Sequence, residues 1–168
     1  MKPIRSVPIV ASIVVLALAA PAAAQSGSLN ITGSTGPKVG LTLVAGELAD
    51  DLQRDFGKGP ILLQFGWQVE GRFPVSRHGA AGYTQLMTLI GGLDQGKILP
   101  SVTWLIGVRG ASGNRIGFGP TVSLAGPAVT LSAGVTKRSG DLHLPIDLAV
   151  QFVERGMTLS LLIGFAGR

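Results

Sequence analysis

Residues 142–152 read LHLPIDLAVQF, and apolar residues alternate along this stretch with mostly polar ones. The apolar residues hold the even positions, and the odd positions hold His143, Pro145, Asp147, Ala149 and Gln151. Successive side chains of a β-strand point to opposite faces, so the pattern predicts a strand with one apolar face and one polar face. In a soluble barrel the apolar face packs inward. In a membrane barrel it faces lipid, and His143 and Asp147 lie in the lumen.

Seven other segments repeat this alternation or a weaker form of it. With the opening stretch they predict eight strands at 38–46, 60–73, 82–91, 97–109, 115–124, 127–136, 141–152 and 156–166, separated by glycine-containing turn signals. Most of these segments reach the ~9–11 residues that a tilted strand needs to cross a bilayer. We therefore expect an all-β protein, an antiparallel up-and-down β-barrel of about eight strands.

One connection departs from the strand pattern. In GELADDLQRDFGKG, residues 46–59, the apolar residues Leu48, Leu52 and Phe56 recur every four positions among charged residues. This spacing is helical. The segment 46–57 is expected to form either a short amphipathic helix over the barrel rim or a solvated loop, and the pattern leaves both open.

The first 24 residues have the pattern of a secretory signal peptide. MKPIRS is positively charged, VPIVASIVVLALAA is apolar, and PAAAQ supplies a small-residue cleavage site after Ala24. The expected organisation is a signal peptide at 1–24, a flexible or partly strand-like lead-in at 25–37, and one barrel domain at 38–168. The chain is therefore expected to be exported.

Composition excludes several classes of protein. Removing Lys2 and Arg5 from 14 basic residues leaves 12 against 9 acidic residues, a net charge of +3, with no long basic run, so nucleic-acid binding is not expected. There is no cysteine, hence no disulfide framework and no thiolate metal site. Charged residues make up 14% of the chain, against about a quarter in soluble domains. No stretch after the signal approaches ~18 apolar residues, so a membrane protein of this sequence must be a β-barrel.

The polar face of the strands favours the membrane barrel. A face in bulk water should be rich in lysine and glutamate, whereas this one is mostly Gly, Ser, Thr and Gln. Its few ionisable residues are Glu70, Arg72, Arg109, Arg115, His143 and Asp147. Small residues with a few charges of both signs suit the narrow lumen of an eight-stranded barrel. Buried charges must be paired, so we expect Glu70 and Asp147 to meet arginines across a largely filled lumen.

Because of three prolines, the sequence does not decide whether the barrel closes completely. Proline belongs at strand starts, edges or bulges, because it donates no ladder hydrogen bond. Pro100 fits a strand start. Pro120 and Pro145 lie within expected strands and imply either bulges or an open barrel.

The chain resembles the small outer-membrane β-barrels of Gram-negative bacteria. The signal peptide MKPIRSVPIVASIVVLALAAPAAAQ, the eight alternating segments and the last strand MTLSLLIGF carry this resemblance. It implies an outer-membrane location, the alternative being the periplasm, with membrane lipid and the barrel-assembly machinery as partners. It also implies that the last strand serves as an assembly signal, read at Met157, Leu159, Leu161, Ile163 and Phe165. Here the chain continues three residues past that aromatic.

Signs of catalysis or metal binding are weak. His143 and Asp147, with Ser132 or Ser160, supply the components of a nucleophilic triad, but four residues along a strand span about 13 Å, too far for a direct hydrogen bond. His78 lies in a turn. Two distant histidines and the Asp50-Asp51 pair make no metal-ligand spacing. No catalytic, cofactor or metal site is expected.

Three functions remain open. The first is a structural or interaction-type outer-membrane barrel without catalysis. The second is an outer-membrane lipid-modifying hydrolase or acyltransferase. The third is a soluble periplasmic barrel that binds an apolar ligand within its apolar face. The sequence leaves the small-molecule ligand, the pore activity and the oligomeric state undetermined.

Overall fold

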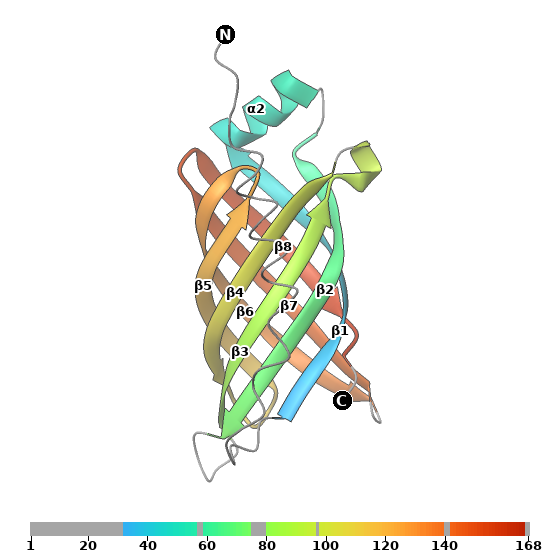
Figure 1. The fold of residues 1–168 in the computed structure, drawn as a ribbon, viewed down its shortest axis with the longest axis vertical. Helices are drawn as coiled ribbons and strands as arrows, with labels where there is room; N and C mark the ends of the chain where they lie inside the picture. The colour runs from blue at the N-terminus through green and yellow to red at the C-terminus, as the bar shows by residue number, and fades with distance from the viewer. Residues whose placement is uncertain (1–31, 57–58, 75–79, 97, 140–141, 167–168) are drawn as a thin grey trace, which may run out of the picture.

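Eight antiparallel strands form a closed barrel in chain order (Figure 1). The computed structural model describes residues 32–56, 59–74, 80–96, 98–139 and 142–166. The strands are β1 (Thr32–Gly46), β2 (Ile61–Pro74), β3 (Ala81–Gly91), β4 (Leu99–Arg109), β5 (Asn114–Ser123), β6 (Gly126–Ser139), β7 (Leu142–Val153) and β8 (Gly156–Gly164). Each pairs with its sequence neighbours, and β1 pairs with β8 to close the ring. The expected architecture is confirmed, while the expected signal peptide at 1–24 lies outside the described residues.

The two ends of the barrel differ. Helix α2 (Glu47–Phe56) stands above the barrel in Figure 1, at the end where β1 connects to β2, and the 3-10 helix η2 (Leu93–Gln95) lies in the connection from β3 to β4. We call this the helix end. The start of β1 and the end of β8 lie at the opposite end, which we call the termini end. The segment expected as a helix or a loop is thus a helix. Among the described residues no helix is long and apolar enough to span a membrane.

The side chains of β7 settle which face is outside. Leu148 and Phe152 are 49% and 50% exposed, whereas Asp147 and His143 are 2% and 5% exposed. The other strands alternate in the same sense: most large apolar residues point outward, and the inward residues are mostly polar or small, with exceptions such as Met87, Leu105 and Leu162. The apolar face therefore forms the outside of the barrel. This arrangement does not fit an apolar ligand held within that face, the third function considered above.

The two internal prolines do not open the barrel. Pro120 pairs with Val129 of β6, but the pairs opposite Gly119 and Pro120 are missing on the β4 side, and the register is the same on both sides of this gap. Pro145 pairs with Thr136 of β6 and lies where the continuous β7–β8 ladder ends. Beside each proline, ladder pairs are missing on one side of its strand, and the register of the ladder does not change. The expectation of bulges or an open barrel is wrong, because a ladder can lose single pairs and remain closed.

Strand β1 begins earlier than expected. It starts at Thr32 and so includes residues 32–37, the end of the expected lead-in, which pair with the last half of β2. These residues are mostly Gly, Ser and Thr, so no apolar alternation marks them in the sequence. The added residues carry Ser34 into the lumen, where it is buried.

Candidate functional site: the charge network in the lumen

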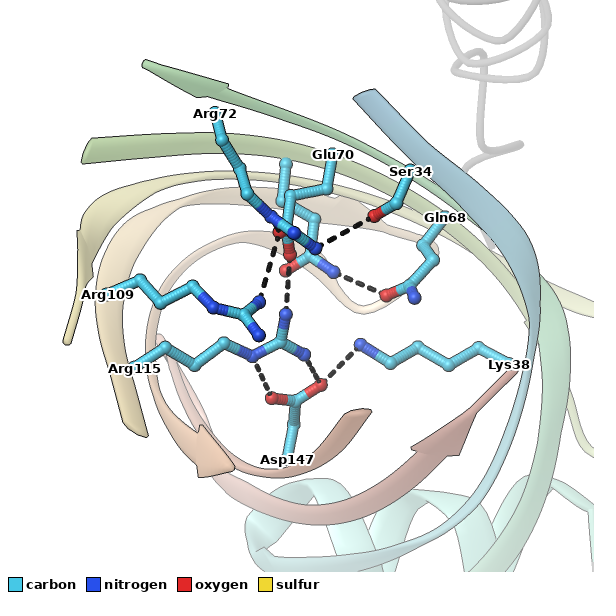
Figure 2. Close-up of polar contacts among 9 residues, drawn as sticks. Ser34, Lys38, Gln68, Glu70, Arg72, Arg109, Arg115 and Asp147 are labelled. Atoms are coloured by element: carbon cyan, nitrogen blue, oxygen red, sulfur yellow. Dashed lines mark hydrogen bonds and ion pairs between the residues drawn. The ribbon is translucent and has the colours of Figure 1, made fainter. Parts of the chain in front are cut away.

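Arg115 lies at the centre of a buried charge network (Figure 2). It projects inward from β5 and joins two carboxylates from other strands. Its Nε donates to Oδ1 of Asp147 at 2.7 Å and its Nη2 donates to Oδ2 of the same carboxylate, while its Nη1 donates to Oε2 of Glu70 at 2.6 Å. Glu70 lies on β2 and Asp147 on β7, so one guanidinium links three strands across the lumen. Charge-assisted, partly bidentate bonds of this kind are among the stronger ones in proteins.

Three more cations complete the network. Lys38 of β1 donates from Nζ to Oδ2 of Asp147 at 2.6 Å. Arg72 donates from Nε to Oε1 of Glu70 and from Nη2 to Oγ of Ser34 at 3.2 Å. Nη1 of Arg109 lies 3.5 Å from Oε1 of Glu70. Both oxygens of each carboxylate therefore contact at least one cation, and all six ionic side chains come from five different strands.

Neutral side chains lie next to these charges in the lumen. Nε2 of Gln85 donates to Oε1 of Gln68 at 2.5 Å. The ring of Tyr83 lies 6.0 Å from the guanidinium carbon of Arg115. Tyr83 fits because β5, two strands away, offers no side chain at this point: a Cβ atom built on Gly117 would lie 2.3 Å from the Tyr83 hydroxyl. Glycine in this lumen thus makes room for large partners.

Asp147 depends on a glycine in the same way. Gly134 pairs with Asp147 across β6 and β7, and a Cβ atom at Gly134 would lie 2.1 Å from Oδ1 of the carboxylate. A side chain at that position would force the carboxylate out of its contacts with Arg115. Gly134 is therefore part of what positions the network.

Further toward the helix end the lumen changes character. Met87, Leu89 and Leu162 form a buried apolar cluster. Beside them, hydroxyl groups pair across neighbouring strands: Thr121 bonds Thr103 at 2.8 Å and Thr130 at 2.5 Å, and Thr42 bonds Ser160 at 2.7 Å. These bonds join residues of β4, β5 and β6, and of β1 and β8. The ionic residues are thus confined to the half of the lumen nearer the termini end.

Five of the six residues expected in the lumen meet in this network: Glu70, Arg72, Arg109, Arg115 and Asp147. The sixth, His143, is buried on the inward face of β7, where its backbone pairs with Ala166. The sequence pattern did not identify Lys38 as a residue of the lumen, although it is the first residue of the strand expected at 38–46. Its parity, opposite to that of Val39, Leu41 and Leu43, could have placed it inward.

The residues considered for a nucleophilic triad have other partners. The carboxylate of Asp147 is held by Arg115 and Lys38, and the Ser160 hydroxyl by Thr42. Ser132 is buried on β6 opposite Ala149. His78 lies outside the described residues. The described contacts thus give Asp147 and Ser160 structural roles.

The residues expected as an assembly signal lie on the outward face at and just beyond β8. Met157, Leu159, Leu161, Ile163 and Phe165 are all between 39% and 48% exposed. Their alternation therefore forms part of the apolar exterior. Recognition by an assembly machinery stays a prediction.

In physical terms, the network links strands that are not neighbours. It joins β1, β2, β4, β5 and β7 through side chains that are buried or nearly so. Removing one partner of a buried ion pair typically costs about 3–5 kcal/mol, because the other charge stays buried without compensation. The arrangement is suited to holding the barrel together.

No protein-family model matches the chain, and no curated protein does. Two solved structures are similar in shape. The crystal structure of Ail, the attachment invasion locus protein of Yersinia pestis, aligns over 80% of this chain and 97% of that one, with 8% identity and a TM-score of 0.48. The same protein in complex with the heparin analogue sucrose octasulfate aligns over the same shares, with 11% identity and a TM-score of 0.31. At these values the likeness carries no inference about function.

Proposed function

We propose that this chain is an outer-membrane β-barrel protein with a structural or interaction role, that it performs no catalysis, and that the charge network closes its lumen to solutes. The observation that carries the proposal is the apolar exterior of a closed barrel. The residues that make up this exterior, and the hydrogen bonds between polar groups on it, support a location in lipid. The charge network supports the closed lumen.

The exterior is a continuous apolar surface, which we call the apolar belt. It consists of the outward side chains of β1 to β8. Among the outward positions whose side chains the structure describes, these strands present no acidic residue and no arginine, and the one lysine, Lys137, lies near the termini end of β6. A charge near the midplane of a bilayer would cost about 2–4 kcal/mol. In water, a belt of this extent would favour aggregation, since monomeric soluble proteins rarely expose contiguous apolar patches beyond a few hundred Å².

Polar groups on the belt bond to each other. The indole N–H of Trp67 donates to Oγ1 of Thr35 at 2.7 Å, and that of Trp104 donates to Oγ1 of Thr84 at 2.8 Å. In each case the threonine lies on an adjacent strand and the same outward face. A side chain in water could bond to solvent, but in hydrocarbon an unpaired N–H costs several kcal/mol. Both tryptophans thus have the partner that a lipid environment requires.

The charge network supports a closed lumen. Arg115 reaches carboxylates on two other strands, and Lys38 approaches Asp147 from the facing wall (Figure 2). A solute entering from the termini end would have to displace these ion pairs. An eight-stranded barrel has an interior just wide enough for side chains to fill.

Two measurements test the proposal. Cell fractionation with gel electrophoresis of unboiled and boiled samples should place the protein in the outer membrane as a band whose mobility changes on boiling. Recovery from the periplasm without detergent would contradict the membrane location. Purified protein in planar bilayers should give no stable conductance, and a steady solute-conducting pore would contradict the closed lumen.

A further inference from the structure

A cavity of about 230 Å³ lies at the helix end of the lumen. Its walls come from α2, from the strand ends and from the turn between β5 and β6. The apolar lining residues are Val44, Leu48, Leu62, Leu99, Pro100, Leu124 and Ala125, and most of the lining surface is apolar. Ligand sites are concave and mostly apolar, with a few placed polar groups. The cavity has this composition.

Two buried polar atoms in the lining have no hydrogen-bond partner among the described residues: Oε1 of Gln64 and Oγ1 of Thr158. Thr158 is 8% exposed. Leaving such an atom unpaired costs about 1–3 kcal/mol. A bound molecule with a hydroxyl group could accept a hydrogen bond from the Thr158 hydroxyl and so give that atom a partner.

The other polar lining groups with described contacts are already engaged. Thr42 bonds Ser160, and the Ser123 hydroxyl donates to the carbonyl of Gly126. Asp51 of α2 accepts hydrogen bonds from Arg54 and Arg155, both exposed at the rim. Of the lining groups without a described partner, Oε1 of Gln64 and Oγ1 of Thr158 are the buried ones, whereas Ser101 and Gln151 are partly exposed.

The charge of the lining selects against anions. Among the described residues that line the cavity, Asp51 is the one ionisable residue, and its carboxylate is paired with Arg54 and Arg155 at the rim. A carboxylate ligand would meet the acidic side chain and lose its hydration without gaining a counter-charge. The volume is below the ~300–1,000 Å³ of sites for drug-sized molecules. These features favour a small neutral molecule over a fatty-acid anion or a lipid with two chains.

We propose that the cavity at the helix end binds a small neutral amphiphile, a short aliphatic chain with a hydroxyl group, whose chain contacts Val44, Leu62 and Leu99 and whose hydroxyl bonds Thr158. This site is separate from the charge network. Its occupancy is read by a different signal from membrane insertion, so either proposal can fail alone.

The test is a titration of the full barrel, folded in detergent and carrying methyl-labelled leucine and valine, with 1-hexanol, followed by NMR. The methyl signals of Val44, Leu62 and Leu99 should shift and saturate, whereas those of Leu131 and Leu148 on the apolar belt should shift only linearly, as partition into detergent requires. Hexanoate at neutral pH should bind at least about fivefold more weakly. Linear, unsaturated shifts at all five residues, or equal binding of hexanoate, would overturn the proposal.

Two variants test the hydrogen bond to the ligand and the space for its chain separately. Thr158→Val keeps the side-chain shape and should weaken 1-hexanol binding about fivefold, the effect of one lost hydrogen bond, while leaving binding of n-hexane unchanged. Val44→Phe should fill the cavity and abolish both. Because Val44→Phe could disturb folding, each variant is first required to keep the heat-dependent gel mobility of the parent. Unchanged 1-hexanol affinity in a folded Thr158→Val protein would refute the assigned hydroxyl contact.

Discussion

The two halves of the lumen use the same eight strands in opposite ways. Toward the termini end, long charged side chains extend into the interior and each carboxylate contacts at least two cations. Toward the helix end, short hydroxyl residues pair with each other, apolar residues line the wall, and a cavity of about 230 Å³ remains. The comparison shows that a polar inward face does not define one kind of interior. Length and charge of the side chains decide whether the barrel is braced or left with space for a ligand.

The largest effect is expected from a substitution in the charge network, which occupies the half of the lumen nearer the termini end; we call this half the braced half. Asp147→Asn keeps the shape but removes the charge that holds both Arg115 and Lys38, so we expect the free energy of unfolding to fall by about 3–5 kcal/mol. The matched control at the helix end is Asp51→Asn. That residue pairs with exposed arginines, so its loss should cost at most about 1 kcal/mol. Urea titration of the folded barrel measures both, and similar losses would contradict the division of the lumen.

The second prediction compares the interior with the exterior. Leu131 lies on the apolar belt in the middle of β6, and Leu131→Arg should destabilise the membrane-embedded barrel by about 2–4 kcal/mol. Leu93→Arg is the control, since Leu93 is equally exposed but lies in η2, outside the strands. Unfolding in lipid vesicles is the measurement. Equal tolerance of both arginines would argue that the belt faces water.

A smaller loss in the free energy of unfolding is expected when a side chain is added next to the charge network. Gly134→Ala places a methyl group against the Asp147 carboxylate and the backbone carbonyl oxygen of Ile146, and overpacking of this kind costs about 1–3 kcal/mol. Gly59→Ala is the control, because a Cβ atom there would meet nothing within 4 Å. The two variants are compared by urea unfolding. A Gly134→Ala protein as stable as the Gly59→Ala protein would show that the carboxylate has room to move.

The smallest change in the free energy of unfolding is expected for a substitution at the helix end. Thr158→Val removes a buried hydroxyl that has no partner among the described residues, so the free energy of unfolding should stay the same or rise slightly. Lys38→Met, a substitution of similar size in the braced half, should be clearly destabilising, because it removes a cation from Asp147. If Thr158→Val destabilised as much as Lys38→Met, the two halves would not differ as described.

Much of this fold is readable in the sequence, because strand alternation has a period of two and a closed barrel has only two faces. The parity of His143 and Asp147 placed both in the lumen, and the scarcity of lysine and glutamate on that face indicated burial. Pairing of Glu70 and Asp147 with arginines followed from the cost of buried charge.

Other features depend on three-dimensional register and could not be read from the pattern. Residues 32–37 lack apolar alternation, so the strand that carries Ser34 inward was not recognised. Pro120 and Pro145 predict bulges or an open barrel, whereas the closed ladder omits pairs beside them. The cavity at the helix end arises from the relative sizes of residues on different strands, which only the closed barrel brings together.

The orientation of the apolar belt is tested most directly by tryptophan fluorescence. The chain has two tryptophans, and Trp67 and Trp104 both lie on the belt, 49% and 58% exposed. In vesicles whose acyl chains carry bromine, emission from the folded protein and from each single-tryptophan variant, Trp67→Phe and Trp104→Phe, should be strongly quenched, while aqueous iodide should have little effect. Strong quenching by iodide, with no effect of the brominated chains, would contradict a barrel whose outer surface faces lipid.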